Sequence, residues 1–351
     1  MKILAIDIGA GTQDILFYDT EKELENSIKL VLPSPPVIIV EKIKEQTIKG
    51  NNIYFDGTIM GGGKIKSAIV SHMDKGYKVA MEKEPARTIK DDLKIVKDLG
   101  VELVDKGSFS KDSKYSNYFK ISLIDVNIEK IISTISDYDI NFSFNKIAVA
   151  AQDHGFSDEM GDRDFRFEKI RERLKHPMAV EELAFLGNVP EYFSRMKAIE
   201  KSLEGLNPII MDSKFASICG ACFDPEISDL NSFVVMDIGN GHTMAASIED
   251  GKIQGVFEHH TSNLSPEKIE KLVKKLVEGT ITHKEIHEDN GHGAHVINGI
   301  SNLEKVVVTG PKRGIIKKTN LDYYNASPGG DVMMTGPVGL INATEYIEND
   351  S

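Results

Sequence analysis

The feature that most constrains the fold of this chain is an internal repeat. Residues 3–18 read ILAIDIGAGTQDILFY and residues 233–248 read FVVMDIGNGHTMAASI, so Asp-Ile-Gly-x-Gly recurs 230 residues later in the same apolar context. In each copy an apolar run ends at an Asp, two glycines allow a tight turn with positive φ, and a second apolar run follows. This is the pattern of a β-hairpin. We therefore expect one structural unit to occur twice.

The residues after each hairpin add a third strand and then alternate between helix and strand patterns. The third strand is expected at 27–32 in the first copy and at 253–257 in the second. Residues 266–278 carry apolar side chains at helical spacing, and 305–309 has the composition of a buried strand. The predicted fold class is α/β, with two duplicated lobes that each open with a three-stranded meander.

The first copy carries about a hundred residues more than the second between its third strand and the next core strand, at 146–150. In this insert, residues 52–56, 63–74, 77–81, 86–99 and 101–104 are expected as strand, helix, strand, helix and strand, and crossovers of that length favour a small parallel sheet. The expected domains are a first lobe over 1–230 with an inserted α/β subdomain at about 37–140, a second lobe over 231–325, and a C-terminal helix within 326–351 that packs back near the cleft.

Composition narrows the range of partners. The 42 Lys and Arg against 54 Asp and Glu give a net charge of −12, which opposes binding to nucleic-acid phosphates and anionic lipid headgroups. The N-terminal apolar run is too short for a signal peptide, and no apolar run has the length of a membrane span. The two cysteines, Cys219 and Cys222, cannot form a disulfide framework. We expect a cytoplasmic protein with neither nucleic-acid nor membrane partners.

Two facing glycine turns suit a polyphosphate. Backbone N–H groups in such turns bind phosphate oxygens, and an Asp at each strand end can reach a Mg²⁺ ion through water. An ordinary hairpin turn is the alternative for a single copy, but the repetition favours a binding site. The candidate contacts are Asp7, Gly9, Ala10, Gly11, Thr12 and Gln13 in the first turn and Asp237, Gly239, Asn240, Gly241, His242 and Thr243 in the second, with Asp7 and Asp237 as the metal ligands.

With these turns in place, the chain resembles the actin, sugar kinase and heat-shock chaperone ATPase superfamily, whose duplicated RNase H-like lobes clamp Mg-ATP. Three further segments stand in the family's order: MDSKFASICGACFD (211–224) resembles the first connecting helix, VVVTGPKRG (306–314) the adenosine segment, and 329–343 the second connecting helix. The resemblance implies an actin-like ATPase fold, ATP and Mg²⁺ as cofactors, and nucleoside contacts from Gly310 and Pro311.

The chain departs from this superfamily at two places. Asn240 and His242 stand where many relatives have Gly and Thr, which predicts an unusual γ-phosphate end of the site. Pro311 and Lys312 replace small polar residues that are common in relatives. The resemblance therefore supports polyphosphate binding more than adenine specificity.

The strings GTIMGGG and VVVTGPKRG are also similar to an uncharacterised archaeal family labelled as pyruvate formate-lyase activating enzymes. A radical activating enzyme needs three clustered cysteines for its iron–sulfur cluster, and this chain has two cysteines in total. Some activator ATPases of the superfamily share a [4Fe–4S] cluster between two subunits, with two cysteines from each. Cys219 and Cys222 are candidates for such a cluster, and ordinary core packing is the alternative.

Two residues are candidates for a general base. In hexokinase-like relatives a carboxylate just before the first connecting helix accepts the proton of the substrate hydroxyl, and Asp212 matches it. The alternative is that Asp212 only caps this helix. His154 follows the strand at 147–151, which ends at the cleft in this fold, and is either a second base candidate or part of a polar loop. Phosphoryl transfer requires mainly positioning and charge neutralisation.

A glycine-rich loop and a pair of histidines are candidates for binding the substrate. Gly61, Gly62, Gly63 and Lys64 lie between a strand and a helix of the insert and suit an anionic group, or else allow close packing or a hinge. They do not form a P-loop, because Ile65 occupies the position of the Mg²⁺-binding Ser or Thr. His259 and His260 follow the third strand of the second lobe and are placed to touch phosphate or substrate.

Seven of the ten histidines lie between His242 and His295, which suggests a metal site. His283 and His287 are spaced i, i+4 and could share one ion with Glu288 or Asp289 and with histidines of the loop at 291–295. No standard zinc spacing is met, and loop histidines on the surface are the alternative.

The sequence predicts an enzyme that binds Mg-ATP and phosphorylates a small anionic metabolite. One alternative is an ATPase switch that activates an anaerobic partner enzyme, with or without a subunit-bridging Fe–S cluster. Another is a nucleotide-binding protein without turnover. A homodimer is compatible with each of these functions.

Overall fold

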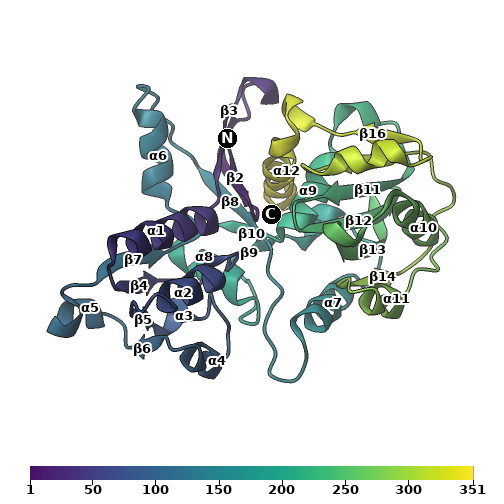
Figure 1. Cartoon of the computed structure of the whole chain (residues 1–351). Helices are drawn as coiled ribbons and strands as arrows, with labels where there is room; N and C mark the ends of the chain where they lie inside the picture. Colours follow the sequence, from purple (N-terminus) through teal and green to yellow (C-terminus); the bar gives the residue numbers. More distant parts are fainter. Residues whose placement is uncertain (351) are drawn as a thin grey trace.

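A computed structural model describes residues 1–350 as two six-stranded sheets and one four-stranded sheet (Figure 1). The strand order is β3-β2-β1-β8-β10-β9 in the first sheet and β14-β13-β12-β11-β15-β16 in the second. The strands are β1 (Lys2–Ile8), β2 (Thr12–Asp19), β3 (Ile28–Pro33), β8 (Lys146–Ala151), β9 (Phe185–Leu186), β10 (Ile209–Met211), β11 (Ser232–Ile238), β12 (His242–Glu249), β13 (Lys252–His260), β14 (Gly293–Val296), β15 (Val306–Thr309) and β16 (Tyr323–Asn325).

The sequence repeat is a structural repeat. β1 pairs antiparallel with β2 and parallel with β8, just as β11 pairs with β12 and β15. The register is also kept, because Asp7 faces Asp14 across the first hairpin and Asp237 faces Met244 across the second. The prediction of an α/β fold with two duplicated, RNase H-like lobes and an α/β insertion is confirmed.

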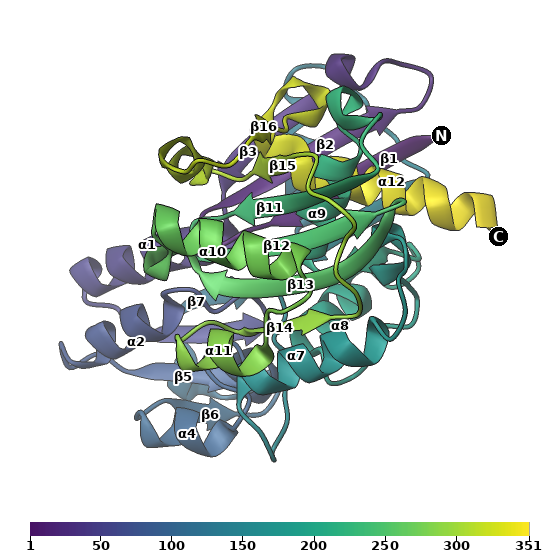
Figure 2. The same cartoon turned by 90° about the vertical axis from the view of Figure 1, so that its right-hand side faces the viewer.

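The central strands of the two sheets have the composition that such a position requires. Every residue of β11 is buried, as are all but the first residue of β1. Helices cover both faces of these strands, so their sequences are nearly continuous apolar runs up to the Asp near each carboxyl end. On the second sheet, α10 (Pro266–Val277) packs against β12 and β13 through the apolar stripe predicted at 266–278 (Figure 2).

Two crossing helices join the lobes. Helix α9 (Ser213–Cys222) follows the first sheet but packs on β11 and β15, whereas α12 (Thr335–Asp350) follows the second sheet but packs on β1 and β8 (Figure 1). The helices cross at Gly220 and Gly339, where an added Cβ on either glycine would overlap the backbone of the other helix. Cys219 is fully buried at this crossing, with its Sγ 3.4 Å from the carbonyl oxygen of Gly339.

The insert contains the small parallel sheet that the sequence predicts, with strand order β6-β5-β4-β7. Its strands are β4 (Ile53–Gly57), β5 (Val79–Glu82), β6 (Glu102–Val104) and β7 (Phe119–Leu123), and its helices are α1 (Pro35–Lys49), α2 (Ile65–Met73), α3 (Lys83–Ala86), α4 (Leu93–Asp98) and α5 (Ser108–Lys111). The structure adds β7 and divides the helix expected at 86–99. Helix α6 (Ile128–Ser136) packs into the core of the first sheet through Ile131 and Ile135, so the insert ends before α6.

One segment of the first half of the chain belongs spatially to the second sheet. Helix α7 (Asp162–Arg173) packs against β14, next to α11 (His283–Glu288), and Met178 forms a bridge to Ile253 of β13 (Figure 2). Helix α8 (Ser194–Ser202) stays with the first sheet. Within residues 1–350, no helix combines the length and the apolar character needed to cross a membrane.

Candidate functional site

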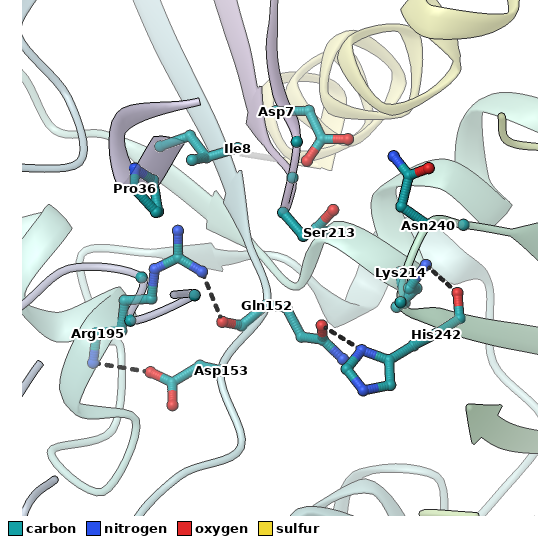
Figure 3. A pocket seen from close by; sticks show the side chains of 18 of the residues that line it. Asp7, Ile8, Pro36, Gln152, Asp153, Arg195, Ser213, Lys214, Asn240 and His242 are labelled. Carbon is teal, nitrogen blue, oxygen red and sulfur yellow. Dashed lines mark hydrogen bonds between the residues drawn. The ribbon is translucent and has the colours of Figure 1, made fainter. Parts of the chain in front are cut away.

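A cavity of about 470 Å³ lies between the two lobes and the insert. Both glycine turns, the loop before α2 and the first turns of α9 and α12 line it (Figure 3). The structure thus brings together residues predicted from five separate stretches of the sequence. The predicted residues that line the cavity are Asp7, Gly9, Ala10, Gly11, Thr12, Gly61, Gly62, Gly63, His154, Asp237, Gly239, Asn240, Gly241, His242, Gly310 and Pro311.

The two turns share one backbone geometry. Gly9 donates its N–H to the carbonyl oxygen of Thr12 at 2.9 Å, and Gly239 donates to that of His242 at 3.1 Å. The prediction of positive φ in these turns is wrong: the residues with positive φ within 1–350 do not include Gly9, Gly11, Gly239 or Gly241. Glycine is required at 239 for lack of space instead, because a Cβ there would lie 2.6 Å from Nζ of Lys214 and 2.8 Å from the carbonyl oxygen of His242.

Each turn is held by the residue that follows the third strand of its lobe, Ser34 or Thr261. The N–H and hydroxyl of each donate to two carbonyl oxygens of the turn: Ser34 to Gly11 and Ala10 at 3.0 and 3.3 Å, and Thr261 to Gly241 and Gly239, both at 2.9 Å. The C=O and N–H of a trans peptide point in opposite directions. The N–H groups of Gly11 and Asn240 therefore point away from these residues, an orientation that suits phosphate oxygens. Sequence reasoning missed both residues.

The carboxylate of the first turn has an unsatisfied oxygen. Oδ1 of Asp7 is buried and has no hydrogen-bond partner within residues 1–350. Burial raises the pKa of Asp7 to about 7, although a hydrogen bond from Ser213 opposes the rise. Asp14, opposite Asp7 on β2, also has a buried, unpartnered Oδ1, and burial together with the charge of Asp7 raises its pKa to about 8. Buried, unsatisfied carboxylate oxygens fit a hard cation such as Mg²⁺.

The carboxylate of the second turn is already paired. Nζ of Lys214 donates to Oδ2 of Asp237 at 2.6 Å, and both side chains are buried. The same ammonium donates to the carbonyl oxygen of His242 at 2.8 Å (Figure 3). Asp7 therefore fits a Mg²⁺ ion better than Asp237 does. Lys214 lies in the predicted connecting helix, but nothing in the sequence indicated that its ammonium group reaches the second turn.

Two helices begin at the cavity. The first turn of α9 contributes Ser213, and that of α12 contributes Thr335 and Gly336. A Cβ on Gly336 would overlap the carboxylate of Asp7, so the start of α12 lies directly against the first strand end. Because the N-terminal end of a helix carries partial positive charge, both helices favour an anion in the cavity.

The insert contributes glycines and basic side chains to the same cavity. A Cβ on Gly61 would lie 2.8 Å from Nη2 of Arg195, so the guanidinium packs directly on the loop. Asp125 holds this guanidinium through two hydrogen bonds of 2.7 and 3.0 Å. Arg87 and Lys90 also line the cavity, whereas the predicted Lys64 does not. Sequence reasoning missed these three basic residues because they lie in parts of the insert and of α8 without a motif.

Asp212, the first candidate for a general base, does not line the cavity. Its Oδ1 caps α9 by accepting the N–H of Lys214 at 3.0 Å, as the capping alternative predicted. The two terminal nitrogens of Arg166 hold its carboxylate at 2.7 and 3.1 Å, and Arg166 also donates its Nε to Glu258 at 2.7 Å. A buried carboxylate held in this way is poorly placed to accept a substrate proton.

His154 and His242 line the cavity and form a cluster with His292. One ring nitrogen of each lies within 4.8 Å of the other two, and Nε2 of His154 is 3.1 Å from Nε2 of His292. Burial lowers the pKa of His154, and it lowers the pKa of His242 to about 4 and that of His292 to about 3. The three imidazoles are therefore neutral near pH 7.

The other predicted histidines lie outside the cavity. His259 is buried, with Nε2 3.0 Å from Asp289, and the ring of His260 packs 4.9 Å from those of His242 and His292. The expected grouping of His283, His287 and the loop histidines around one ion is not formed: the first two both contact Asp164, at 3.2 and 3.3 Å, and His295 is 2.8 Å from the carbonyl oxygen of Leu174.

Two predicted phosphate contacts also face elsewhere. The side-chain amide of Gln13 donates to the carbonyl oxygen of Pro33 at 3.1 Å, and the hydroxyl of Thr243 lies 3.0 Å from that of Thr261. Both residues stabilise the hairpins behind the turns rather than the cavity wall.

The fold and the site define a two-lobed protein of actin-like ATPase architecture. The sequence matches the family described as "Putative pyruvate format-lyase activating enzyme (DUF1786)" over residues 60–315. The protein belongs to this family, which confirms the resemblance to the family that carries the activating-enzyme label. No curated protein matches the chain.

Three solved structures align with nearly the whole chain at low identity. The activator of 2-hydroxyisocaproyl-CoA dehydratase from Clostridium difficile with bound ADPNP is 10% identical, with 99% of this chain and 98% of that chain covered and a TM-score of 0.38. A Bacteroides thetaiotaomicron protein with actin-like ATPase fold and unknown function is 10% identical (96% and 95%; TM-score 0.36). ROK hexokinase from Thermus thermophilus is 10% identical (100% of both chains; TM-score 0.34).

The residues present do not fit the iron–sulfur cluster that the family label implies. Cys219 is buried in the crossing of α9 and α12, and Cys222 lies one turn further along the same helix. Burial raises the pKa of both thiols, which disfavours the thiolate form that a cluster requires. Cys219 could reach a second subunit only if the two helices separated.

Proposed function

We propose that this protein binds a Mg²⁺–nucleoside triphosphate between the two turns and transfers the terminal phosphoryl group to a small anionic metabolite. One observation carries the proposal: a single cavity is lined by both phosphate-type turns and by a basic, glycine-rich face of the insert. Phosphoryl transfer needs positioning and charge neutralisation more than covalent chemistry, and this cavity offers both.

The polyphosphate would lie between the turns. The N–H groups of Gly11 and Asn240 and the two helix N-termini provide positive charge there, while Lys214 balances the charge of Asp237. Asp7, with Asp14 behind it, would hold the Mg²⁺ ion, which when bound neutralises charge on the phosphates. Asp237 would not hold the ion itself, because its carboxylate is paired with Lys214; it would fix the position of that ammonium group.

The nucleoside would lie on the side of Gly310. This residue has φ +90°, and a Cβ would lie 2.5 Å from Oδ1 of Asp237, so only glycine fits this close to the second turn. Pro311, Val332 and Met333 also line the cavity and offer apolar surface to a base. Adenine as that base follows from the resemblance of the adenosine segment.

The acceptor would lie against the insert, where Arg87 and the loop at 61–63 favour a carboxylate or phosphate group, while Lys90 is paired with Asp162 at 2.8 Å. Its hydroxyl oxygen forms the bond to the γ-phosphorus while the bond to the bridging oxygen breaks and the nucleoside diphosphate leaves. With Mg²⁺ on Asp7 and no metal ion on the histidine cluster, the neutral imidazole of His154 would take the hydroxyl proton, because Asp212 does not reach the cavity.

Calorimetric titration with ATP, with and without Mg²⁺, tests this proposal. We expect Mg²⁺-dependent binding in the wild type and a loss of the Mg²⁺ dependence in Asp7→Asn, with Asp74→Asn on the exposed end of α2 as the matched control. Absence of ATP binding by the wild type would refute the proposed function. Binding without turnover in the presence of candidate anionic metabolites would favour the nucleotide-binding alternative.

The crossing of α9 and α12 favours a second candidate, an ATPase switch that activates a partner enzyme. The two lobes meet at two glycines without side chains, a joint at which they could rotate when nucleotide binds. A switch predicts hydrolysis that a partner protein, rather than a metabolite, accelerates. Hydrolysis assays with and without metabolite pools separate the two functions, and size-exclusion chromatography tests the predicted homodimer.

A further inference from the structure

We propose that His154, His242 and His292 form a binding site for one divalent transition-metal ion, with Zn²⁺ as the best fit. The three residues come from three separate parts of the chain, namely the exit of β8, the start of β12 and the loop before β14. The proposal does not require that the cavity binds nucleotide, and it concerns a site distinct from the oxygen ligands at Asp7.

The distances between the ring nitrogens suit a shared ion. A tetrahedral Zn²⁺ with three imidazole ligands separates the nitrogens by about 3.3 Å. Nε2 of His154 and Nε2 of His292 are 3.1 Å apart, and a nitrogen of His242 lies within 4.8 Å of both, so a small side-chain rotation completes the set. Two ring nitrogens that face each other share either a single N–H···N hydrogen bond or a common metal ion.

One member of the cluster is buried and incompletely satisfied. His292 is 2% exposed, and its Nδ1 has no hydrogen-bond partner within residues 1–350. Its Nε2 is the nitrogen that faces His154, so a metal ion on Nε2 would place the proton of His292 on Nδ1.

A hydrogen-bond chain fixes the tautomer of His242. Glu258 is fully buried; one of its oxygens accepts from Arg166, and the other accepts the side-chain N–H of Gln152 at 2.7 Å. The side-chain oxygen Oε1 of Gln152 therefore faces Nδ1 of His242, at 3.1 Å, and accepts a hydrogen bond from its N–H (Figure 3). This leaves the lone pair on Nε2 of His242, which is how protein carboxylates and amides orient metal-binding imidazoles.

The buried charges behind the cluster favour a cation. Asp212, Arg166 and Glu258 form a continuous chain of ion pairs, with two carboxylates to one guanidinium and hence one net negative charge. Lys214, whose ammonium lies in the cavity wall, is paired with Asp237. A divalent ion on the histidines would compensate this excess charge within the low-dielectric interior.

The donor set selects the class of metal. Three imidazole nitrogens suit Zn²⁺, Co²⁺ and similar ions, whereas Mg²⁺ prefers oxygen ligands. Because His154 and His242 line the cavity while His292 lies behind them, an ion on the three would keep an open coordination position toward the cavity. That position can take an anionic oxygen of a bound ligand, next to the second turn.

Titration of the chelator-treated protein with Co²⁺ tests the site, since the visible absorption of Co²⁺ reports coordination number and ligand type. We expect one Co²⁺ per chain with a tetrahedral spectrum, displaced by Zn²⁺. His154→Gln and His242→Gln should each lower the affinity about 100-fold or more, and Gln152→Leu, which removes only the orientation of His242, about 10- to 100-fold. The control is the double variant His283→Gln/His287→Gln, which removes the i, i+4 pair.

The outcomes separate the proposal from its alternatives. A wild-type spectrum that persists in His154→Gln and His242→Gln but vanishes in the control would move the site to α11 and overturn the proposal, as would the absence of Co²⁺ binding. Circular dichroism of each variant shows whether a lost signal reflects unfolding. Asp7→Asn should keep the Co²⁺ spectrum, so failure of nucleotide binding and failure of the metal site are distinguishable.

Discussion

The first and second turns share a backbone but carry different chemistry. Gly9 and Gly239 make the same turn hydrogen bond, and Ser34 and Thr261 hold the turns from equivalent positions. The first turn places a buried, unsatisfied carboxylate at the cavity. The second places a carboxylate that is neutralised by Lys214, next to the histidine cluster.

This difference shows what the duplication preserves and what it leaves free. The backbone interactions hold the N–H groups toward the cavity in both halves, and they depend on glycine and on one hydroxyl residue. The side chains that decide which ion binds come from other elements: α9 supplies Lys214, and the exit of β8 supplies His154. The two turns are therefore expected to bind the same polyphosphate while attracting different cations.

The largest expected effect follows from removing the ion pair at the second turn. Lys214→Met leaves the carboxylate of Asp237 buried and unpaired, and loss of one partner of a buried ion pair costs about 3–5 kcal/mol of unfolding free energy. Urea denaturation measures it. The double variant Lys214→Met/Asp237→Asn should recover most of the loss, because no charge is then left uncompensated. Equal stability of the single and double variants would show that the pair does not matter.

At the first turn, removing the carboxylate charge should raise the stability of the protein rather than lower it. The pKa of Asp7 is raised to about 7 in the folded protein, so its contribution to stability is greatest below about pH 4 and declines as the pH rises toward 7. Asp7→Asn lacks this penalty, so it should be more stable than the wild type at pH 8, by about 2–4 kcal/mol, and nearly equal at pH 4. Denaturation in the presence of a chelator, at both pH values, tests this. A pH-independent difference would contradict the raised pKa.

Two alanine substitutions in the second turn should show whether glycine is required there for lack of space or for backbone freedom. Gly239→Ala forces Nζ of Lys214 or the carbonyl of His242 to move and should cost about 1–3 kcal/mol, with a loss of ATP affinity. Gly241→Ala meets no atom within 4 Å and is the matched control. Thermal unfolding and calorimetry give both quantities. If the two variants behaved alike, crowding would not be the reason for glycine at 239.

The features that the sequence predicted correctly are local or repeated. An apolar run that ends in Asp-Ile-Gly-x-Gly specifies a strand and a turn within ten residues, and its recurrence specifies the duplicated fold. The parallel sheet of the insert follows from alternating strand and helix patterns in the same way. These features can be predicted because strand pairing and apolar burial leave a repeated pattern along the sequence.

The site predictions that the structure does not support depend on contacts between distant residues. Asp212 matched a base by its position before α9, but Arg166, from another helix, binds its carboxylate. The spacing of His283 and His287 suggested a metal site, whereas His292 turns toward His154 and His242. Nothing local in the sequence encodes these contacts, because the partners come from different elements that only the tertiary fold brings together.

The smallest expected effect concerns the feature that the turns share. Ser34→Ala and Thr261→Val each remove a hydroxyl that donates to a turn carbonyl but leave the parallel backbone hydrogen bond in place. Each should cost about 0.5–1.5 kcal/mol of stability, with Thr261→Val at the upper end because it also removes the partner of the Thr243 hydroxyl, and each should lower ATP affinity by less than about tenfold. Calorimetry on the two variants measures these effects directly. A much larger loss of affinity for Thr261→Val than for Ser34→Ala would mean that the polyphosphate depends mainly on the second turn, and the equivalence of the two backbones would then be a property of the fold alone.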